Sequence, residues 1–349
     1  MDTVTNIPYW YRPHRSRTKL PIVFIHGIGI GLLPYIPFLR ELALQDPDVG
    51  IIAIEVLPIC MHITEQPLAR DAICDAITRI LSGHGLRRIV LAGHSYGTAI
   101  SAYLLRRQWG SVDRPLIPPN STPTTPLLQR PTRGSANRVS NIVGANGNGS
   151  DGGDLIAATL LMDPIPFLLH YPAVAYNFVY RPPRYANEWQ LWYFASRDAD
   201  VSRALSRHFF WFECILFRED VLGSCAGASA AAAAAAGVKD EGRVMPVTVS
   251  LAGRDQIVDG PAVHAYLTNG EQCTPGAAGA GAPSRWAQDS LEVLYYPELD
   301  HATVFDTRQR RAPILEVLHR FVRLEESNGE NEDGIAGAGT SLDGLVDVE

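Results

Sequence analysis

The chain has 349 residues, of which 46% are hydrophobic and 19% are charged, and its formal net charge is −7. The residues from Glu325 onward include eight acidic side chains and no Lys, Arg or His, so the rest of the chain is close to neutral. Without a basic patch or a nucleic-acid-binding motif, the composition argues against a nucleic-acid partner. The length suits one α/β core of about 250 residues with insertions better than two independent domains.

The start of the chain predicts one strand within Thr3–Arg12. Met1–Lys19 lacks the apolar stretch of a signal peptide. No apolar run in the sequence reaches the ~20 residues that span a bilayer. We therefore expect a cytoplasmic protein without a transmembrane segment, although the short N-terminus weakens any statement about targeting.

Two glycine-rich corners follow apolar runs. Residues Pro21–Gly31 read PIVFIHGIGIG, a strand that enters a glycine-rich loop, and Arg88–Gly97 read RIVLAGHSYG. In the second corner Ser95 has a glycine two residues before it and another two residues after it. Glycines at these positions allow a turn sharp enough to hold the serine hydroxyl clear of the backbone. The pattern predicts a nucleophilic Ser95, and the alternative is a glycine-rich turn with a solvated serine.

These two motifs resemble those of the α/β-hydrolase superfamily. Its members carry a His-Gly-x-Gly-type loop after strand 3 and a Gly-x-Ser-x-Gly elbow after strand 5. The resemblance implies that backbone N–H groups bind the oxyanion, from Tyr96 and from Ile28, with Gly29 as the substitute for Ile28. It also implies two strands before the strand that leads into the oxyanion loop, whereas this sequence has room for one. We expect His26 to brace the loop rather than to act in catalysis.

Strands alternate with helices along the chain, which predicts an α/β fold with a mostly parallel sheet flanked by helices on both faces. The expected strands are Ile22–His26, Gly50–Leu57, Arg88–Gly93, Ala157–Asp163, Val247–Ala252 and Leu291–Tyr296. The expected helices are Tyr35–Ala43, Leu68–Ser82, Thr98–Gln108, Gly260–Leu267 and Pro313–Leu324.

A serine nucleophile needs a base, and the base needs a carboxylate that orients it. His301 lies in the loop after the last expected strand, where the resemblance implies the catalytic histidine. His94 is next to Ser95 in sequence, but its side chain is expected to point away.

Three aspartates compete for the role of the acid. Asp255 follows the strand Val247–Ala252 in the turn Gly-Arg-Asp, which resembles the Gly-x-x-Asp sequence of many superfamily members, and it is the preferred candidate. Asp163 ends the preceding strand and is the main alternative, since some hydrolases place their acid there. Asp259 is a weaker alternative.

The predicted organisation has three parts. Residues 1–163 and 246–324 form the α/β core with a flexible insertion at 110–154, residues 164–245 form a cap inserted in the core, and residues 325–349 form a disordered acidic tail. The stretches Ala226–Gly237 and Pro275–Pro283 are Ala/Gly-rich and are expected to be loops.

The cap is unusually aromatic. Residues Ile165–Phe217 hold 15 of the 30 Phe, Tyr and Trp residues of the chain, interleaved with arginines. Most of these rings are expected to form the core of the cap itself, and the others to wall an apolar pocket above Ser95. Peripheral membrane contact through the cap stays open.

The five cysteines have no paired or metal-type spacing, which favours free thiols. The glycines of the first corner lack the spacing of a dinucleotide fingerprint or a P-loop. The sequence therefore indicates neither a cofactor nor a metal.

Together these features predict a serine hydrolase that cleaves a small-molecule ester with an apolar acyl or aryl group. Ser95, His301 and Asp255 are the expected triad, with Asp163 as the alternative acid. A thioesterase, amidase or lyase on the same scaffold, and a binding protein without catalysis, are the other hypotheses. The oligomeric state does not follow from the sequence.

Overall fold

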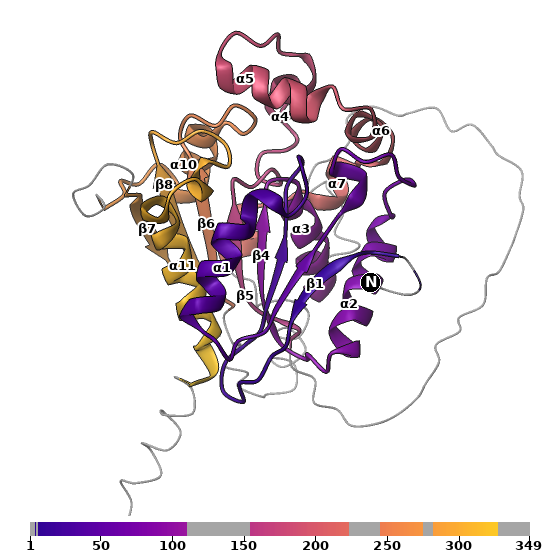
Figure 1. The fold of residues 1–349 in the computed structure, drawn as a ribbon. Coiled ribbons are helices and arrows are strands. Elements are labelled where there is room, and N and C mark those ends of the chain that lie inside the picture. Colours follow the sequence, from indigo (N-terminus) through magenta and orange to yellow (C-terminus); the bar gives the residue numbers. More distant parts are fainter. Residues whose placement is uncertain (1–3, 5, 110–153, 223–244, 275–281, 327–349) are drawn as a thin grey trace, which may run out of the picture.

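A computed structural model describes residue 4 and residues 6–109, 154–222, 245–274 and 282–326. Its centre is an eight-stranded sheet in the order β1-β3-β2-β4-β5-β6-β8-β7 (Figure 1). The strands are β1 Tyr9–Arg12, β2 Ile22–Ile25, β3 Ile51–Ile54, β4 Ile89–His94, β5 Ile156–Met162, β6 Val247–Ala252, β7 Ser284–Gln288 and β8 Leu291–Tyr296. Only β1 and β7, at the two edges, run antiparallel to their neighbours.

Helices cover both faces of the sheet, so its inner strands are buried and apolar on both sides. Helices α1 (Ile36–Gln45) and α11 (Arg308–Val322) pack on one face, where Phe24 of β2 lies in the same cluster as their side chains. The opposite face holds α2 (Arg70–Gly83), α3 (Tyr96–Gln108) and α10 (Gly260–Thr268). The expected α/β fold is thus confirmed.

Three elements differ from the expectations. Strand β3 ends at Ile54 rather than at Leu57, and Leu57 begins the short 3-10 helix η2 (Leu57–Ile59). Strand β7 was not predicted, because most of its residues are polar and at least partly exposed, and Trp286 alone is buried. Helix α11 begins at Arg308 rather than at Pro313, because the Thr307 side chain accepts a hydrogen bond from the Arg310 N–H and caps the helix there. Pro313 lies inside that helix. The single strand expected before β2 is present as β1.

The described residues 164–222, here called the inserted segment, leave the sheet after β5. Its helical elements are α4 (Ala173–Ala175), the π-helix η4 (Tyr176–Tyr180), α5 (Ala186–Leu191), the π-helix η5 (Trp192–Ser196), α6 (Ala199–His208), α7 (Trp211–Cys214) and α8 (Arg218–Leu222). In Figure 1, α4, α5 and α6 lie above the carboxyl ends of the parallel strands.

Several predicted stretches lie outside the described residues. They are the loop Gly110–Asp154 except its last residue, the Ala/Gly-rich stretch Ala226–Gly237, most of Pro275–Pro283 and the acidic tail beyond residue 326. Within the described ranges, Cys60, Cys74, Cys214 and Cys273 are free thiols, as expected. No described helix combines the length and the apolar character needed to cross a membrane.

Candidate active site

Ser95 occupies a sharp turn between the end of β4 and the start of α3. Its backbone has φ 51° and ψ −119°, a conformation that costs a non-glycine residue roughly 1–3 kcal/mol. The turn is held from both sides, because the Ser95 N–H donates to the Met162 carbonyl at 2.9 Å and the Thr98 N–H donates to the Ser95 carbonyl at 2.9 Å. A side chain at Gly97 would collide with the Ile25 carbonyl of β2, so glycine is required there for α3 to pack this closely.

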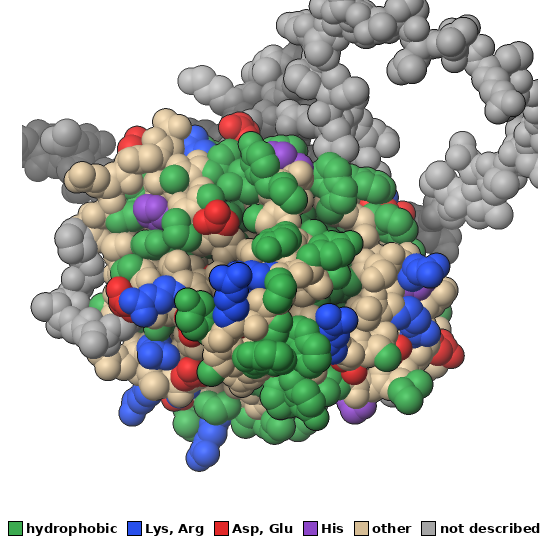
Figure 2. Space-filling model, turned by 90° about the horizontal axis from the view of Figure 1, so that it is seen from above, with side chains coloured by type: hydrophobic (Ala, Val, Ile, Leu, Met, Phe, Trp, Pro, Cys, Tyr) green, Lys and Arg blue, Asp and Glu red, His purple; other side chains and the backbone are tan. Residues whose placement is uncertain are grey.

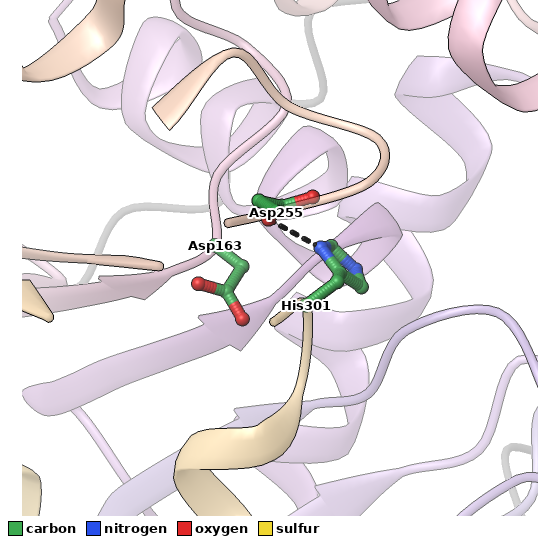
Figure 3. Close-up of side chains that lie close together, drawn as sticks. All are labelled: Asp163, Asp255 and His301. Carbon is green, nitrogen blue, oxygen red and sulfur yellow. Dashed lines mark hydrogen bonds and ion pairs between the residues drawn. The ribbon is translucent and has the colours of Figure 1, made fainter. Parts of the chain in front are cut away.

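His301 and Asp255 come from loops after β8 and β6 and meet next to this turn. The His301 Nε2 atom lies 2.9 Å from Ser95 Oγ. On the other side of the ring, His301 Nδ1 lies 2.6 Å from Asp255 Oδ2, the contact drawn in Figure 3. The other Asp255 oxygen accepts the N–H groups of Ile257 at 2.7 Å and Val258 at 2.9 Å. The structure thus brings together the three side chains that the sequence singles out.

The charges around the imidazole favour its protonated form. Burial lowers the pKa of His301, but the carboxylates of Asp255 and Asp163 outweigh that effect and raise it to about 8. Burial also raises the pKa of Asp255, against the opposing influence of His301 and of the Ile257 amide. With Nε2 directed at the serine oxygen, the imidazole is placed to take up a proton from the hydroxyl.

Asp163 lies near the same histidine but has different partners. Its oxygens accept the N–H groups of Ala252 at 3.1 Å and Ala302 at 2.8 Å. Burial acts to raise the pKa of Asp163, but His94, His301 and the Ala302 amide outweigh it and hold the pKa below its ordinary value. Asp163, Asp255 and His301 offer ligand atoms that all lie within 4.8 Å of one another. Figure 3 shows that Asp255, and not Asp163, is hydrogen-bonded to the His301 ring.

A buried polar network behind the serine was not foreseen from the sequence. The Gly27 N–H donates to the Tyr35 hydroxyl at 3.1 Å, and this hydroxyl donates to His94 Nδ1 at 2.7 Å. His94 Nε2 then faces Asp163 Oδ2 at 3.5 Å. Burial lowers the pKa of His94, which favours the neutral ring that this arrangement needs. We expected His94 to point away from the nucleophile. Its ring nitrogens face Tyr35 and Asp163, and its ring packs against those of His301 and Phe305, with centroids 5.2 Å and 5.0 Å away.

The loop after β2 is fixed against Ser95. His26 is neutral, since burial lowers its pKa to about 4, and it accepts the Val56 N–H at 2.9 Å while Nδ1 donates to the Gly27 carbonyl at 2.6 Å. It therefore braces the loop, as expected. A Cβ atom at Gly27 would lie 2.8 Å from Ser95 Cβ, so this glycine allows the loop to approach the serine closely.

The backbone amides expected to bind an oxyanion differ in their availability. The Gly29 N–H donates to the Ile59 carbonyl at 3.1 Å, so it is already engaged. The N–H of Ile28 makes no such bond to the described residues, and that of Tyr96 is the first amide of α3, which has no partner inside the helix. Of the three expected donors, Ile28 and Tyr96 are therefore the two whose N–H groups make no backbone hydrogen bond to the described residues.

The inserted segment is attached to loops on both sides of Ser95, which is only 5% exposed. On one side, Asn177 and Arg181 donate to the backbone carbonyls of Ile257 at 3.0 Å and Gln256 at 2.5 Å, in the loop that carries Asp255. On the other side, the Thr64 hydroxyl donates to Asp200 of α6 at 2.9 Å. The segment thus spans the site.

Most aromatic side chains of this segment are exposed. The expectation that most of them form the core of the segment is therefore wrong. Of the fifteen rings, those of Phe167 and Phe178 are buried and those of Trp192 and Phe209 are half-buried. The eleven exposed rings belong to Tyr171, Tyr176, Tyr180, Tyr185, Trp189, Tyr193, Phe194, Phe210, Trp211, Phe212 and Phe217. Figure 2 looks down on this side of the molecule and shows hydrophobic side chains gathered across it.

Comparison with known proteins finds similarity among solved structures. No model of a protein family matches the chain, and no curated protein matches it. An α/β-hydrolase enzyme from a Medee basin deep-sea metagenome library is 12% identical with a TM-score of 0.47, and the match covers 97% of each chain. The Paleococcus ferrophilus monoacylglycerol lipase is 12% identical with a TM-score of 0.44, over 90% of this chain and 98% of that one. A carboxylesterase structure from the thaumarchaeon Nitrososphaera gargenis is 14% identical with a TM-score of 0.45, over 92% and 98%.

The mostly parallel sheet, the serine turn at the end of β4 and the flanking helices fit the α/β-hydrolase fold, with one strand before β2 in place of two. The resemblance seen in the sequence is confirmed at the level of the fold. The activity does not follow from the fold and has to be inferred from the site.

Proposed function

We propose that the protein is a serine hydrolase that cleaves carboxylic esters with an apolar acyl or aryl group. The observation that carries this proposal is the continuous chain of contacts from Asp255 Oδ2 through His301 to Ser95 Oγ, with distances of 2.6 Å and 2.9 Å. It is supported by the strained turn that presents Ser95 and by the two unengaged amides beside it.

In the proposed reaction Ser95 is the nucleophile. His301 Nε2 removes the hydroxyl proton as Oγ attacks the ester carbonyl, and Asp255 stabilises the imidazolium that forms. The protonated imidazole then gives its proton to the departing alcohol, which leaves an acyl group on Ser95. Water, deprotonated by His301, hydrolyses that acyl-enzyme. These steps need no cofactor.

The Ile28 and Tyr96 amides are proposed to bind the anionic oxygen of the tetrahedral intermediates. Donors that are already oriented stabilise such a charge by roughly 3 kcal/mol each. The His26 contacts hold the first amide in place, and the N-terminus of α3 carries the second. The engaged Gly29 amide argues against the alternative donor.

The inserted segment is proposed to act as a cap that limits the access of water to Ser95. Its exposed rings would contact the apolar part of a substrate or the surface of a lipid aggregate that contains it. Tyr and Trp favour such interfaces because each ring combines an apolar body with a polar group. We accordingly propose peripheral contact with lipid through this face.

A fluorophosphonate probe tests the chemistry directly. We expect it to label Ser95 in the native protein and to label nothing in Ser95→Ala, which should also lose several orders of magnitude in kcat towards aryl esters. Labelling at another serine, or full turnover by Ser95→Ala, would contradict the proposal. Matched ester, thioester and amide substrates separate an esterase from a thioesterase or amidase.

A further inference from the structure

A cavity of about 330 Å³ lies beside the proposed triad. It is bounded by the loop after β3, the first turns of α2 and α3, and the residues around α7. Ser95 and His301 do not line it, but Tyr96, the residue after the proposed nucleophile, does. Its volume is within the range of pockets that bind small molecules.

The inner wall of the cavity is apolar except for two tyrosine hydroxyls. Val56, Ile73 and Ile100 are buried and contribute the apolar wall. Tyr96 and Tyr103 are 6% and 7% exposed, and their hydroxyls make no hydrogen bond to the described residues. Burial raises the pKa of both hydroxyls, so both are neutral.

Both tyrosine side chains line the cavity. Within the described part of the chain, the fully enclosed side-chain atoms without a hydrogen-bond partner are His94 Nε2 and Trp109 Nε1, and no tyrosine oxygen is among them. A ligand that displaces water from these hydroxyls without bonding to them would leave buried polar groups unpaired, so a ligand that bonds to them is favoured. The tyrosines therefore point to a polar group on a ligand.

Carboxylates determine the charge of the cavity. Glu55, Glu65 and Glu213 line it, against the cationic Arg70 and the titratable His208. Arg70 Nε lies 3.0 Å from Asp71 Oδ1, outside the lining set, and the Arg70 charge also interacts with that of Glu213. Neither Glu55 nor Glu213 forms an ion pair or side-chain hydrogen bond with a described residue. The lining is therefore negative whether or not His208 is protonated.

We propose that this cavity binds a protonated alkylamine group of the substrate, with the alkyl chain on the apolar wall. This inference rests on the proposed ester hydrolysis at Ser95, next to which the cavity lies. The ammonium N–H groups would donate to the tyrosine oxygens and to Glu55 or Glu213, and the tyrosine rings attract a cation. A carboxylate ligand would meet like charge, and an uncharged alkyl chain would leave the carboxylates without a partner.

Binding to Ser95→Ala, measured by calorimetry, tests the site without turnover. Hexylammonium should bind, hexanol should bind at least about tenfold more weakly, since a charged hydrogen bond contributes 1.5–3 kcal/mol, and hexanoate should not bind. Added in the same background, Glu55→Gln, Glu213→Gln and Tyr103→Phe should each weaken hexylammonium binding by about threefold to tenfold. Glu219→Gln, an exposed carboxylate on α8, is the matched control and should leave it unchanged.

Ester hydrolysis by the native protein is the second test of the cation site. The 4-nitrophenyl ester of 6-aminohexanoate should have a higher kcat/KM than that of hexanoate. Glu55→Gln should reduce this preference, and the control Glu219→Gln should keep it. Hexylammonium binding without turnover of either ester would refute the proposed function but not the cation site. Turnover with equal binding of hexylammonium and hexanol, or with no response to the Glu55 and Glu213 variants, would refute the cation site.

Discussion

Asp163 and Asp255 lie close to the same imidazole and differ in what they accept. Asp255 accepts the imidazole N–H, whereas Asp163 accepts two backbone N–H groups. In Asp255→Asn the amide would favour the wrong tautomer of His301, and we expect kcat for an aryl ester to fall by about 10⁴. A larger loss of kcat in Asp163→Asn than in Asp255→Asn would mean that the acid has been assigned to the wrong strand.

Asp163→Asn should affect folding more than chemistry. The amide nitrogen cannot accept the N–H of Ala252 or Ala302, so one buried donor loses its partner. We expect the free energy of unfolding to fall by roughly 1–3 kcal/mol, measured by urea denaturation with circular dichroism. The Asp255→Asn variant, unfolded in parallel, shows how much of that loss is common to both buried carboxylates.

The pH dependence of the reaction should report His301. The base acts only when neutral, and its pKa is raised to about 8, so kcat/KM should rise with pH and reach half of its plateau near pH 8. Asp163→Asn removes a negative charge that favours the imidazolium, so the midpoint should move to lower pH. A profile that is flat between pH 6 and about 9 would exclude His301 as the titrating base.

The residues at strand ends could be singled out from the sequence, because local pattern marks Ser95, Asp255 and His301. Local pattern did not distinguish Asp255 from Asp163 conclusively, since both follow an apolar strand. Tyr35 had no such signal. Its hydroxyl joins Gly27 to His94, which is 59 residues away in the chain, and no periodicity records a contact of that kind.

Strands that are buried inside the sheet could be predicted from the sequence, and the exposed edge strand β7 could not. The strands β2, β4, β5, β6 and β8 are runs of apolar residues, and each was predicted with its ends within two residues. Strand β7 lies at the edge of the sheet, where polar residues are tolerated, and its sequence lacks the apolar run of the inner strands.

The close packing of the loop after β2 against the serine turn gives a further prediction. In Gly27→Ala the added Cβ would lie 2.8 Å from Ser95 Cβ and 2.9 Å from His94 Nδ1, so the loop must move away. Displacing one oxyanion donor should lower kcat by about 10²–10³. Gly83→Ala at the end of α2, where no atom lies within 4 Å, is the control and should leave kcat unchanged. Equal kcat in the two variants would contradict the proposed oxyanion site.

The exposed rings of the inserted segment, here called the aromatic face, could bind the whole molecule to a lipid surface. Tyr180 and Tyr193 are 72% and 64% exposed on the inserted segment, whose arginines would favour an anionic surface. Replacing both tyrosines by Ser should weaken binding to vesicles of phosphatidylcholine and phosphatidylglycerol by at least about tenfold in a sedimentation assay.

Trp10→Ser, on the edge strand β1 and with Trp10 66% exposed, is the control for that experiment and should bind vesicles like the native protein. Hydrolysis of a short soluble ester should be unchanged in all three proteins. If the double variant binds vesicles normally but loses self-association in light scattering, the aromatic face joins copies of the chain instead.

Hydrogen bonds join Gly27 to Tyr35 and Tyr35 to His94, and Asp163, whose Oδ2 lies 3.5 Å from His94 Nε2, accepts the Ala302 N–H. These contacts connect the loops after β2, β4, β5 and β8. Because these loops share polar partners that are costly to expose unpaired, they should open as one cooperative unit. The amide protons of Gly27 and Ala302 would then exchange with solvent at similar opening free energies, although the two residues are far apart in sequence. On heating, the reactive geometry would persist until this unit opens, so inactivation would coincide with the opening of these loops.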